Sequence, residues 1–183
     1  MRQDARANAA ISILDKFLVG QNLNSILLRW TKNNRYAGSS DRESIRNIVF
    51  DVLRVKKTLT SVLEKEKQPI NGRALVFLYS VYYALNLNDI FTGQEYGPEK
   101  LTIFEREFSK ISKENINGYF KITDNIPDFL IAEFKRSLGR KFKHVMRLLE
   151  KRAPISIRVN PLKSDISSIL ELSLIHISEP TRR

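Results

Sequence analysis

Along most of the chain, hydrophobic residues recur at three- and four-residue steps, which is the spacing of helices with one apolar face. The run from Ala74 to Leu85 is almost entirely apolar or aromatic and predicts the buried central helix. It follows a predicted turn at Asn71 and Gly72, and Pro127 and Gly139 are expected to open and close a later helix. The pattern therefore predicts an all-α fold for the larger part of the chain.

One helix has a candidate start signal in its own side chains. Ser40 lies three residues before Glu43, the spacing of a capping box, in which each side chain accepts a hydrogen bond from the other residue's backbone N–H. Trp30, at helical spacing in the preceding apolar stripe, is interpreted as core or core-edge in preference to a base-stacking surface, and Glu105 is interpreted as ordinary surface charge.

The spacing changes to alternation near the end of the chain. Ile155, Ile157 and Val159 alternate with polar residues, which predicts a strand, and Ser164 is predicted to cap a helix after it. A strand and a helix that follow an all-helical block predict the opening of a second, α/β domain. The expected domains are a helical domain over 1–152, the truncated start of an α/β domain over 153–171, and a tail over 172–183.

The tail has an unusual sequence. Residues 172–182 read LSLIHISEPTR, which looks like the translation of an adapter used in sequencing libraries. We therefore interpret 172–183 as a non-native, adapter-like tail and leave it out of fold reasoning. On this interpretation we expect that the natural chain was cut short near Glu171.

The composition limits the chemistry that this chain can perform. Its 183 residues include no cysteine and two histidines, His144 and His176. The absence of cysteine excludes thiol nucleophiles and cysteine-type zinc sites, and two histidines make a metal site or a hydrolytic triad hard to build. We therefore predict no catalytic, cofactor-binding or metal-ligating residue in this chain.

No membrane association is predicted either. No apolar run approaches the length of about 18 residues that a spanning helix needs. No apolar leader follows Met1, so we expect a cytoplasmic protein.

The formal net charge is +11, and the positive residues are unevenly distributed. Residues 1–57 contain 11 Lys and Arg against 5 Asp and Glu, residues 58–124 contain 8 against 9, and residues 125–171 contain 10 against 5. A positive excess at both ends of the chain predicts a polyanionic partner.

The arginines of the first segment are the best candidates for contacts with that partner. At about 100° per residue, Arg42, Arg46 and Arg54 fall along one flank of a helix together with Lys57, and Phe50 lies between them. The planar guanidinium group binds phosphate oxygens in pairs and stacks on bases. The pattern favours a phosphate-binding surface, and the alternative is a solvated helix face with scattered basic residues.

Two parts of the sequence resemble a known family. From Asp41, the outline DRExxRxxVFDVLR resembles a helix of the NusB-type helical domain. The run IPDFLIAEFKRSLGRKF at 126–142, followed by RAPISIRVNPLK at 152–163, looks like the signature of the Sun/RsmB-type (RsmB/NOP family) RNA cytosine-5 methyltransferases. Phe129 stands where this family often has tryptophan.

The resemblance implies a NusB-like helical bundle, followed by the first strand and helix of an incomplete RRM-like α/β domain. Family members use a catalytic domain that binds S-adenosylmethionine, and a cysteine thiolate adds to C6 of cytosine. This chain has no cysteine and no glycine-rich cofactor loop after a strand. The catalytic domain is therefore an expected partner in cis that is missing here, and S-adenosylmethionine is expected only in the parent enzyme.

By the same resemblance, the chain would recruit ribosomal RNA for methylation and would not be an enzyme by itself. The residues expected to contact RNA, with Tyr36 stacking on a base, are Arg2, Arg6, Arg35, Tyr36, Arg42, Arg46 and Arg54. The alternative is a stand-alone NusB-type RNA-binding factor in transcription antitermination or ribosome assembly. Such a factor should end after its last helix, whereas a strand and a helix are predicted after residue 153. A basic domain on anionic membranes is the least favoured reading.

Overall fold

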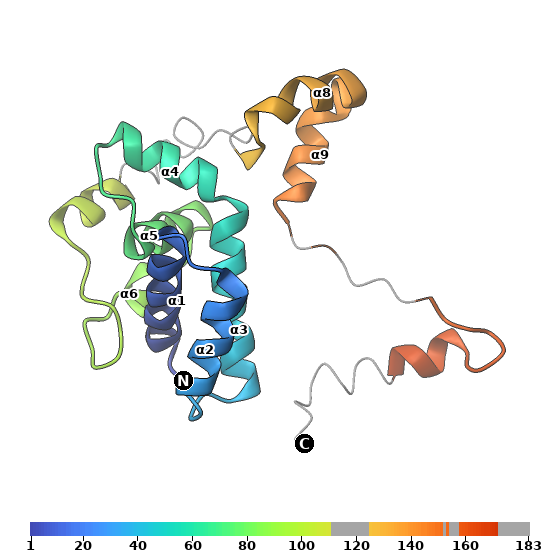
Figure 1. Ribbon diagram of the computed structural model, residues 1–183, viewed down its shortest axis with the longest axis horizontal. Helices are drawn as coiled ribbons and strands as arrows, with labels where there is room; N and C mark the ends of the chain where they lie inside the picture. The colour runs from blue at the N-terminus through green and yellow to red at the C-terminus, as the bar shows by residue number, and fades with distance from the viewer. Residues whose placement is uncertain (111–124, 152, 154–157, 172–183) are drawn as a thin grey trace. The chain divides into compact units, whose positions relative to one another are not determined.

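The computed structural model in Figure 1 describes residues 1–110, 125–151, 153 and 158–171. All regular structure in these ranges is helical, which confirms the all-α prediction for them. The strand expected at 155–159 falls largely on 154–157, outside the described residues, and 158–160 form no regular element. The predicted tail, 172–183, also lies outside the described residues.

The described part of the chain is a succession of helices. In chain order they are α1 (Gln3–Leu18), α2 (Leu23–Asn33), α3 (Ser39–Arg54), α4 (Lys56–Lys65), α5 (Gly72–Tyr82), α6 (Leu87–Ile90), a helix over 103–110, α8 (Asp128–Leu138), the 3-10 turn η2 (Gly139–Lys141), α9 (Phe142–Leu149) and a short helix over 166–171.

The chain divides into two compact units, Met1–Lys151 and Arg152–Arg183. None of the described helices has the length and apolar character needed to cross a membrane. Within the same residues, no group of histidine, aspartate and glutamate side chains is placed to hold a metal ion. The assignment of the units to particular domain families stays a prediction.

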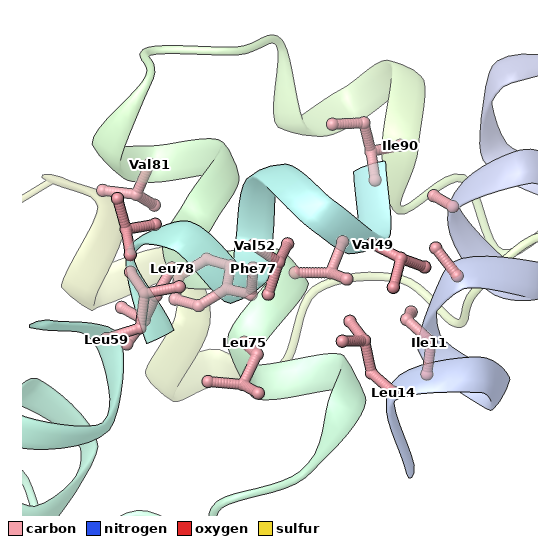
Figure 2. Close-up of a cluster of buried hydrophobic side chains, with 14 of the residues drawn as sticks. Ile11, Leu14, Val49, Val52, Leu59, Leu75, Phe77, Leu78, Val81 and Ile90 are labelled. Carbon is pink, nitrogen blue, oxygen red and sulfur yellow. The ribbon is translucent and has the colours of Figure 1, made fainter. Parts of the chain in front are cut away.

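The main core of the first unit forms where α1, α3 and α5 pack together (Figure 2). Leu14, Val49 and Leu75 are completely buried there. Four consecutive residues of α5, 75–78, are buried, so this helix is covered on all sides, as its apolar run predicts. The expected central helix is confirmed up to Tyr82, but the predicted helix was too long, because α5 ends there and 83–85 are exposed.

A glycine permits the close crossing of α1 and α5. The Gly72 N–H donates to Asp15 Oδ1 at 2.6 Å, and a Cβ atom added at Gly72 would lie 2.4 Å from the Ile11 carbonyl oxygen. Asn71 caps α5 by accepting from the Ala74 N–H at 2.8 Å, which confirms a helix start at the predicted Asn-Gly turn.

The capping box predicted at Ser40 and Glu43 is wrong. Helix α3 begins at Ser39 with Gly38 as its N-cap, and no side chain caps it, because Ser40 already lies inside the first turn. A reciprocal pair of this kind occurs instead at Thr102 and Glu105: the Thr102 N–H donates to Glu105 Oε2 at 2.8 Å, and the Glu105 N–H donates to Thr102 Oγ1 at 3.2 Å.

Glu105 is therefore not ordinary surface charge. It is 7% exposed and accepts two hydrogen bonds from Arg73, one from Nε at 3.0 Å and one from Nη2 at 2.8 Å. Two other helix ends can be compared with the prediction. Gly139 ends α8 with a φ of 49°, as expected, whereas the helix over 166–171 is capped by Asp165, not Ser164.

Helices α8 and α9 form a second, small apolar cluster around Ile126, Phe142 and Met146. Polar contacts connect this part with the rest of the first unit: Lys57 Nζ donates to the Ile126 carbonyl at 2.9 Å, and the Tyr82 hydroxyl donates to Glu150 at 3.2 Å. Burial, together with the Glu150 charge, raises the pKa of Tyr82 to about 12.

Candidate nucleic-acid interface

A groove between α2 and α3 brings aromatic, aliphatic and basic side chains together. Its volume is about 540 Å³. We call it the α2–α3 groove, and the residues that line it are Asn24, Leu27, Leu28, Trp30, Thr31, Arg42, Ile45, Arg46 and Phe50.

Arg42, Arg46 and Phe50 reach this groove from consecutive turns of α3. A step of four residues rotates a helix by about 40° beyond a full turn, so these side chains share one face. The Arg42 Nε is buried and has no hydrogen-bond partner among the described residues. A buried donor without a partner costs about 1–3 kcal/mol. The groove therefore contains a cationic donor that lacks an acceptor.

No described carboxylate forms an ion pair with Arg42 or Arg46. Arg46 is exposed, and Arg42 is half-buried. Because no carboxylate in the described part of the chain compensates these two guanidinium groups, their charge is available to an external anion.

The apolar side of the groove is partly accessible. Leu28 is 64% exposed and Phe50 is 37% exposed, whereas Trp30 is half-buried and packs against the main core. An aromatic surface beside arginines can stack on a base while the arginines bind phosphate. The interpretation of Trp30 as core or core-edge is therefore correct.

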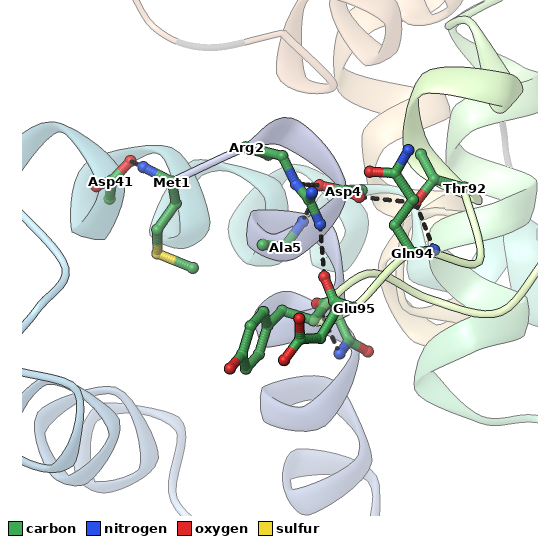
Figure 3. Close-up of polar contacts among 10 residues, drawn as sticks. Met1, Arg2, Asp4, Ala5, Asp41, Thr92, Gln94 and Glu95 are labelled. Atoms are coloured by element: carbon green, nitrogen blue, oxygen red, sulfur yellow. Dashed lines mark hydrogen bonds and ion pairs between the residues drawn. The ribbon is translucent and has the colours of Figure 1, made fainter.

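Arg2 and Arg6, two of the predicted contacts, are engaged inside the protein. Arg2 donates to Asp4 Oδ1 at 3.2 Å and to the Glu95 carbonyl (Figure 3). Arg6 donates to Asp41 Oδ1 at 3.0 Å, and the N-terminal ammonium group binds the same oxygen at 3.0 Å. Carboxylates thus compensate both guanidinium charges.

These contacts also change the two carboxyl groups. The hydrogen bond from the N-terminal ammonium, with help from Arg6, lowers the pKa of Asp41. Burial acts to raise the pKa of Asp4, but hydrogen bonds from Thr92, the Ala5 N–H and Arg2 outweigh it and lower this pKa. The ionised carboxylates are therefore part of the folded structure.

Arg54 lies away from the α2–α3 groove. It pairs with Asp51 and lines a separate hollow beside Ile126. Twelve residues after Arg42, the helix has rotated by about 120°, so the two arginines no longer share a face. Lys57 does not continue the flank either, because α3 ends at Arg54 and Lys57 belongs to α4.

Arg35 and Tyr36 are exposed in the connection between α2 and α3, but they do not line the groove. The Tyr36 hydroxyl donates to Asn34 Oδ1 at 3.0 Å. The structure thus brings together two of the seven predicted RNA contacts and adds Trp30, Leu28 and Phe50. The RNA-binding role of all seven stays a prediction.

The groove has the character of a binding surface. Arginine and aromatic side chains can hold phosphates and bases, and none of the described residues that line the groove is a histidine or an acidic residue that could transfer a proton or attack a substrate. No protein-family model, curated protein or solved structure matches this chain.

Proposed function

We propose that the helical unit binds RNA through the α2–α3 groove. The observation that supports this most strongly is the buried, unpartnered Nε of Arg42 beside Arg46 and the accessible edges of Trp30 and Phe50. A phosphate oxygen would supply the missing acceptor, and charge-assisted hydrogen bonds of this kind are among the strongest that proteins form.

The net charge and the lining of the groove favour RNA over a peptide ligand. With a charge of +11, the protein attracts polyanions over a long range. Contacts with phosphates would position a structured RNA, and an unpaired base could stack on the aromatic edge. Ribosomal RNA in the cytoplasm is the proposed partner.

We further propose that the chain is the N-terminal part of a Sun/RsmB-type ribosomal RNA cytosine-5 methyltransferase. The support is the RVN run at 158–160 after the IPDFL run at 126–130, together with the arginine-rich sequence of α3. In this proposal the first unit is a NusB-like bundle and the second begins an RRM-like domain. Methyl transfer from S-adenosylmethionine belongs to a catalytic domain elsewhere in the parent protein.

The genomic reading frame beyond Glu171 tests this second proposal. We expect it to continue into a glycine-rich cofactor loop and two cysteine motifs. A native stop codon there would contradict the proposal and would favour a stand-alone NusB-type factor.

RNA binding can be measured with the chain's only tryptophan. Trp30 lines the groove, so titration with an RNA hairpin derived from ribosomal RNA should change its fluorescence. Arg42→Ala with Arg46→Ala should weaken binding about tenfold or more, because two charge-assisted contacts are lost. Lys141→Ala with Lys143→Ala removes the same charge outside the groove and is the matched control. Equal loss in both variants would contradict a role for the groove.

A further inference from the structure

A second hollow, larger than the α2–α3 groove, lies at the C-terminal end of α5. It has a volume of about 710 Å³ and is bordered by the end of α5, by α6 and by the helix over 103–110. This volume falls within the range of about 300–1,000 Å³ that is usual for small-molecule sites. We call it the α5–α6 cavity.

Three cationic side chains border the α5–α6 cavity: Lys100, Arg106 and Lys110. Arg106 and Lys110 are four residues apart, so they share a face of their helix. The same helix buries Glu105 and Phe108. None of the described residues lining the cavity is acidic, and none of the three cations forms an ion pair with a described carboxylate.

The rest of the lining is apolar, with a few amide and hydroxyl groups. Leu87 and Leu101, both half-buried, provide apolar surface, Phe91 is buried at 3% exposure, and Asn88 and Thr92 provide polar atoms. A ligand that matches this lining has an anionic end for the cations and a planar or apolar body for the leucine surface.

One side chain holds the cationic wall in place. Arg73 donates to the carbonyls of Glu99 and Lys100, both at 3.1 Å, and pairs with Glu105. Its guanidinium carbon also lies 5.0 Å from the centre of the Phe91 ring. Arg73 thus connects α5 with residues 99 and 100, with Glu105 in the helix over 103–110, and with Phe91. These contacts preorganise the cavity for a ligand.

We propose that the α5–α6 cavity binds a phosphorylated nucleotide, with its phosphate at Lys100, Arg106 and Lys110 and its base against Leu87 and Leu101. A phosphate carries enough negative charge to meet several cations, and the arginine fork matches two of its oxygens. The nucleotide has two sources with the same chemistry, a free nucleotide or the phosphorylated end of an RNA chain.

The full-length chain can be titrated with adenosine 5′-monophosphate, adenosine and inorganic phosphate by calorimetry. We expect saturable binding of the monophosphate, with adenosine and phosphate each at least about tenfold weaker, because each lacks one part of the ligand. Absence of monophosphate binding, or phosphate binding of equal strength, would overturn the proposal.

Variants locate the site. Arg106→Ala with Lys110→Ala should weaken monophosphate binding about tenfold or more. Lys141→Ala with Lys143→Ala removes the same charge elsewhere, and this control should stay within about twofold of the parent chain. Arg106 and Lys110 are exposed, and circular dichroism checks that the first variant is folded. An unchanged affinity in that variant, or an equal loss in the control, would overturn the site.

Two further measurements distinguish a free nucleotide from a phosphorylated RNA end and distinguish this site from the α2–α3 groove. If a 5′-phosphorylated RNA oligomer depends on Arg106 and Lys110 more than its unphosphorylated form does, the ligand is an RNA end; if only the monophosphate depends on them, it is a free nucleotide. Both results support the site. Trp30 lines the α2–α3 groove, so monophosphate binding that calorimetry detects without a change in Trp30 fluorescence does not occupy that groove, and failure of RNA binding at the groove would not affect this result.

Discussion

Two arginines at the start of α1, Arg2 and Arg6, have the same side-chain chemistry as the two arginines of the α2–α3 groove, but their partners differ. Arg2 and Arg6 donate to Asp4 and Asp41, whereas Arg42 and Arg46 have no described carboxylate partner. The first pair therefore contributes to the fold, and the second pair offers its charge to an external anion.

The difference shows why a net charge of +11 does not by itself define a binding surface. A guanidinium group that binds a carboxylate is a weak site for phosphate, because the phosphate must compete with an internal anion. The arginines most suitable for recognition are those that folding leaves without a counter-ion.

Among the arginines that pair with a carboxylate, Arg73 donates two hydrogen bonds to a buried partner, Glu105, so its removal should have the largest effect on stability. Arg73→Ala would leave the buried Glu105 carboxylate without its partner, which should lower the free energy of unfolding by about 3–5 kcal/mol. Chemical denaturation measures this loss. Arg106→Ala, at an exposed position that forms no ion pair with a described carboxylate, is the matched control and should change stability by less than about 0.5 kcal/mol. Similar midpoints for the two variants would show that pairing does not distinguish these arginines.

The salt dependence of RNA binding should show which arginines neutralise phosphates. Each phosphate contact contributes about 0.7–0.9 to the slope of log affinity against log salt concentration. Arg42→Ala with Arg46→Ala should therefore reduce the slope by about 1.4–1.8. Binding measured over a series of salt concentrations tests this, and a slope equal to that of the parent chain would remove both residues from the interface.

The ion pairs of Asp41 with the N-terminal ammonium group and with Arg6 predict a pH dependence of stability. Its folded-state pKa lies below the ordinary value of 3.8, so the stabilisation is complete above that value and is lost as the pH falls through the folded pKa. Asp41→Asn should cost about 2 kcal/mol at neutral pH and should flatten the dependence in acid. Thermal unfolding between about pH 2 and 6 measures both effects. If the stability of the variant falls as steeply with decreasing pH as that of the parent chain, the role of Asp41 in the pH dependence is contradicted.

Arg6 should give the smallest effect. Its side chain is 31% exposed, so Arg6→Ala should lower the free energy of unfolding by about 1 kcal/mol or less. RNA affinity should remain within about twofold, since solvent and salt screen one distant charge. A large affinity loss without a stability loss would place Arg6 with the binding arginines.

Local sequence signals predicted much of the helical framework. The apolar run of α5 with Asn71 before it, and Gly139 after α8, act through neighbouring residues, and the structure confirms both ends. The capping box was misplaced because Ser40–Glu43 and Thr102–Glu105 have the same spacing. Arg73, 32 residues earlier in the chain, fixes Glu105, and only the tertiary structure reveals this contact.

The candidate site was predictable in part for the same reason. The rotation of about 120° along α3 from Arg42 to Arg54 puts the two arginines on different faces, and it could have been calculated from helix geometry alone. The pairing of Arg6 with Asp41 spans 35 residues, and the position of Trp30 beside α3 depends on the packing of two helices. Contacts of this range have no signal in the local pattern.

The most direct test compares the two arginine pairs in one RNA-binding experiment. Arg42→Gln with Arg46→Gln and Arg2→Gln with Arg6→Gln remove the same charge, and both proteins are measured with the same RNA hairpin at a temperature where circular dichroism shows them folded. We predict that the first variant loses about tenfold or more in affinity and the second less than about threefold. Equal losses, or a larger loss in the second variant, would contradict the claim that the unpaired arginines bind RNA.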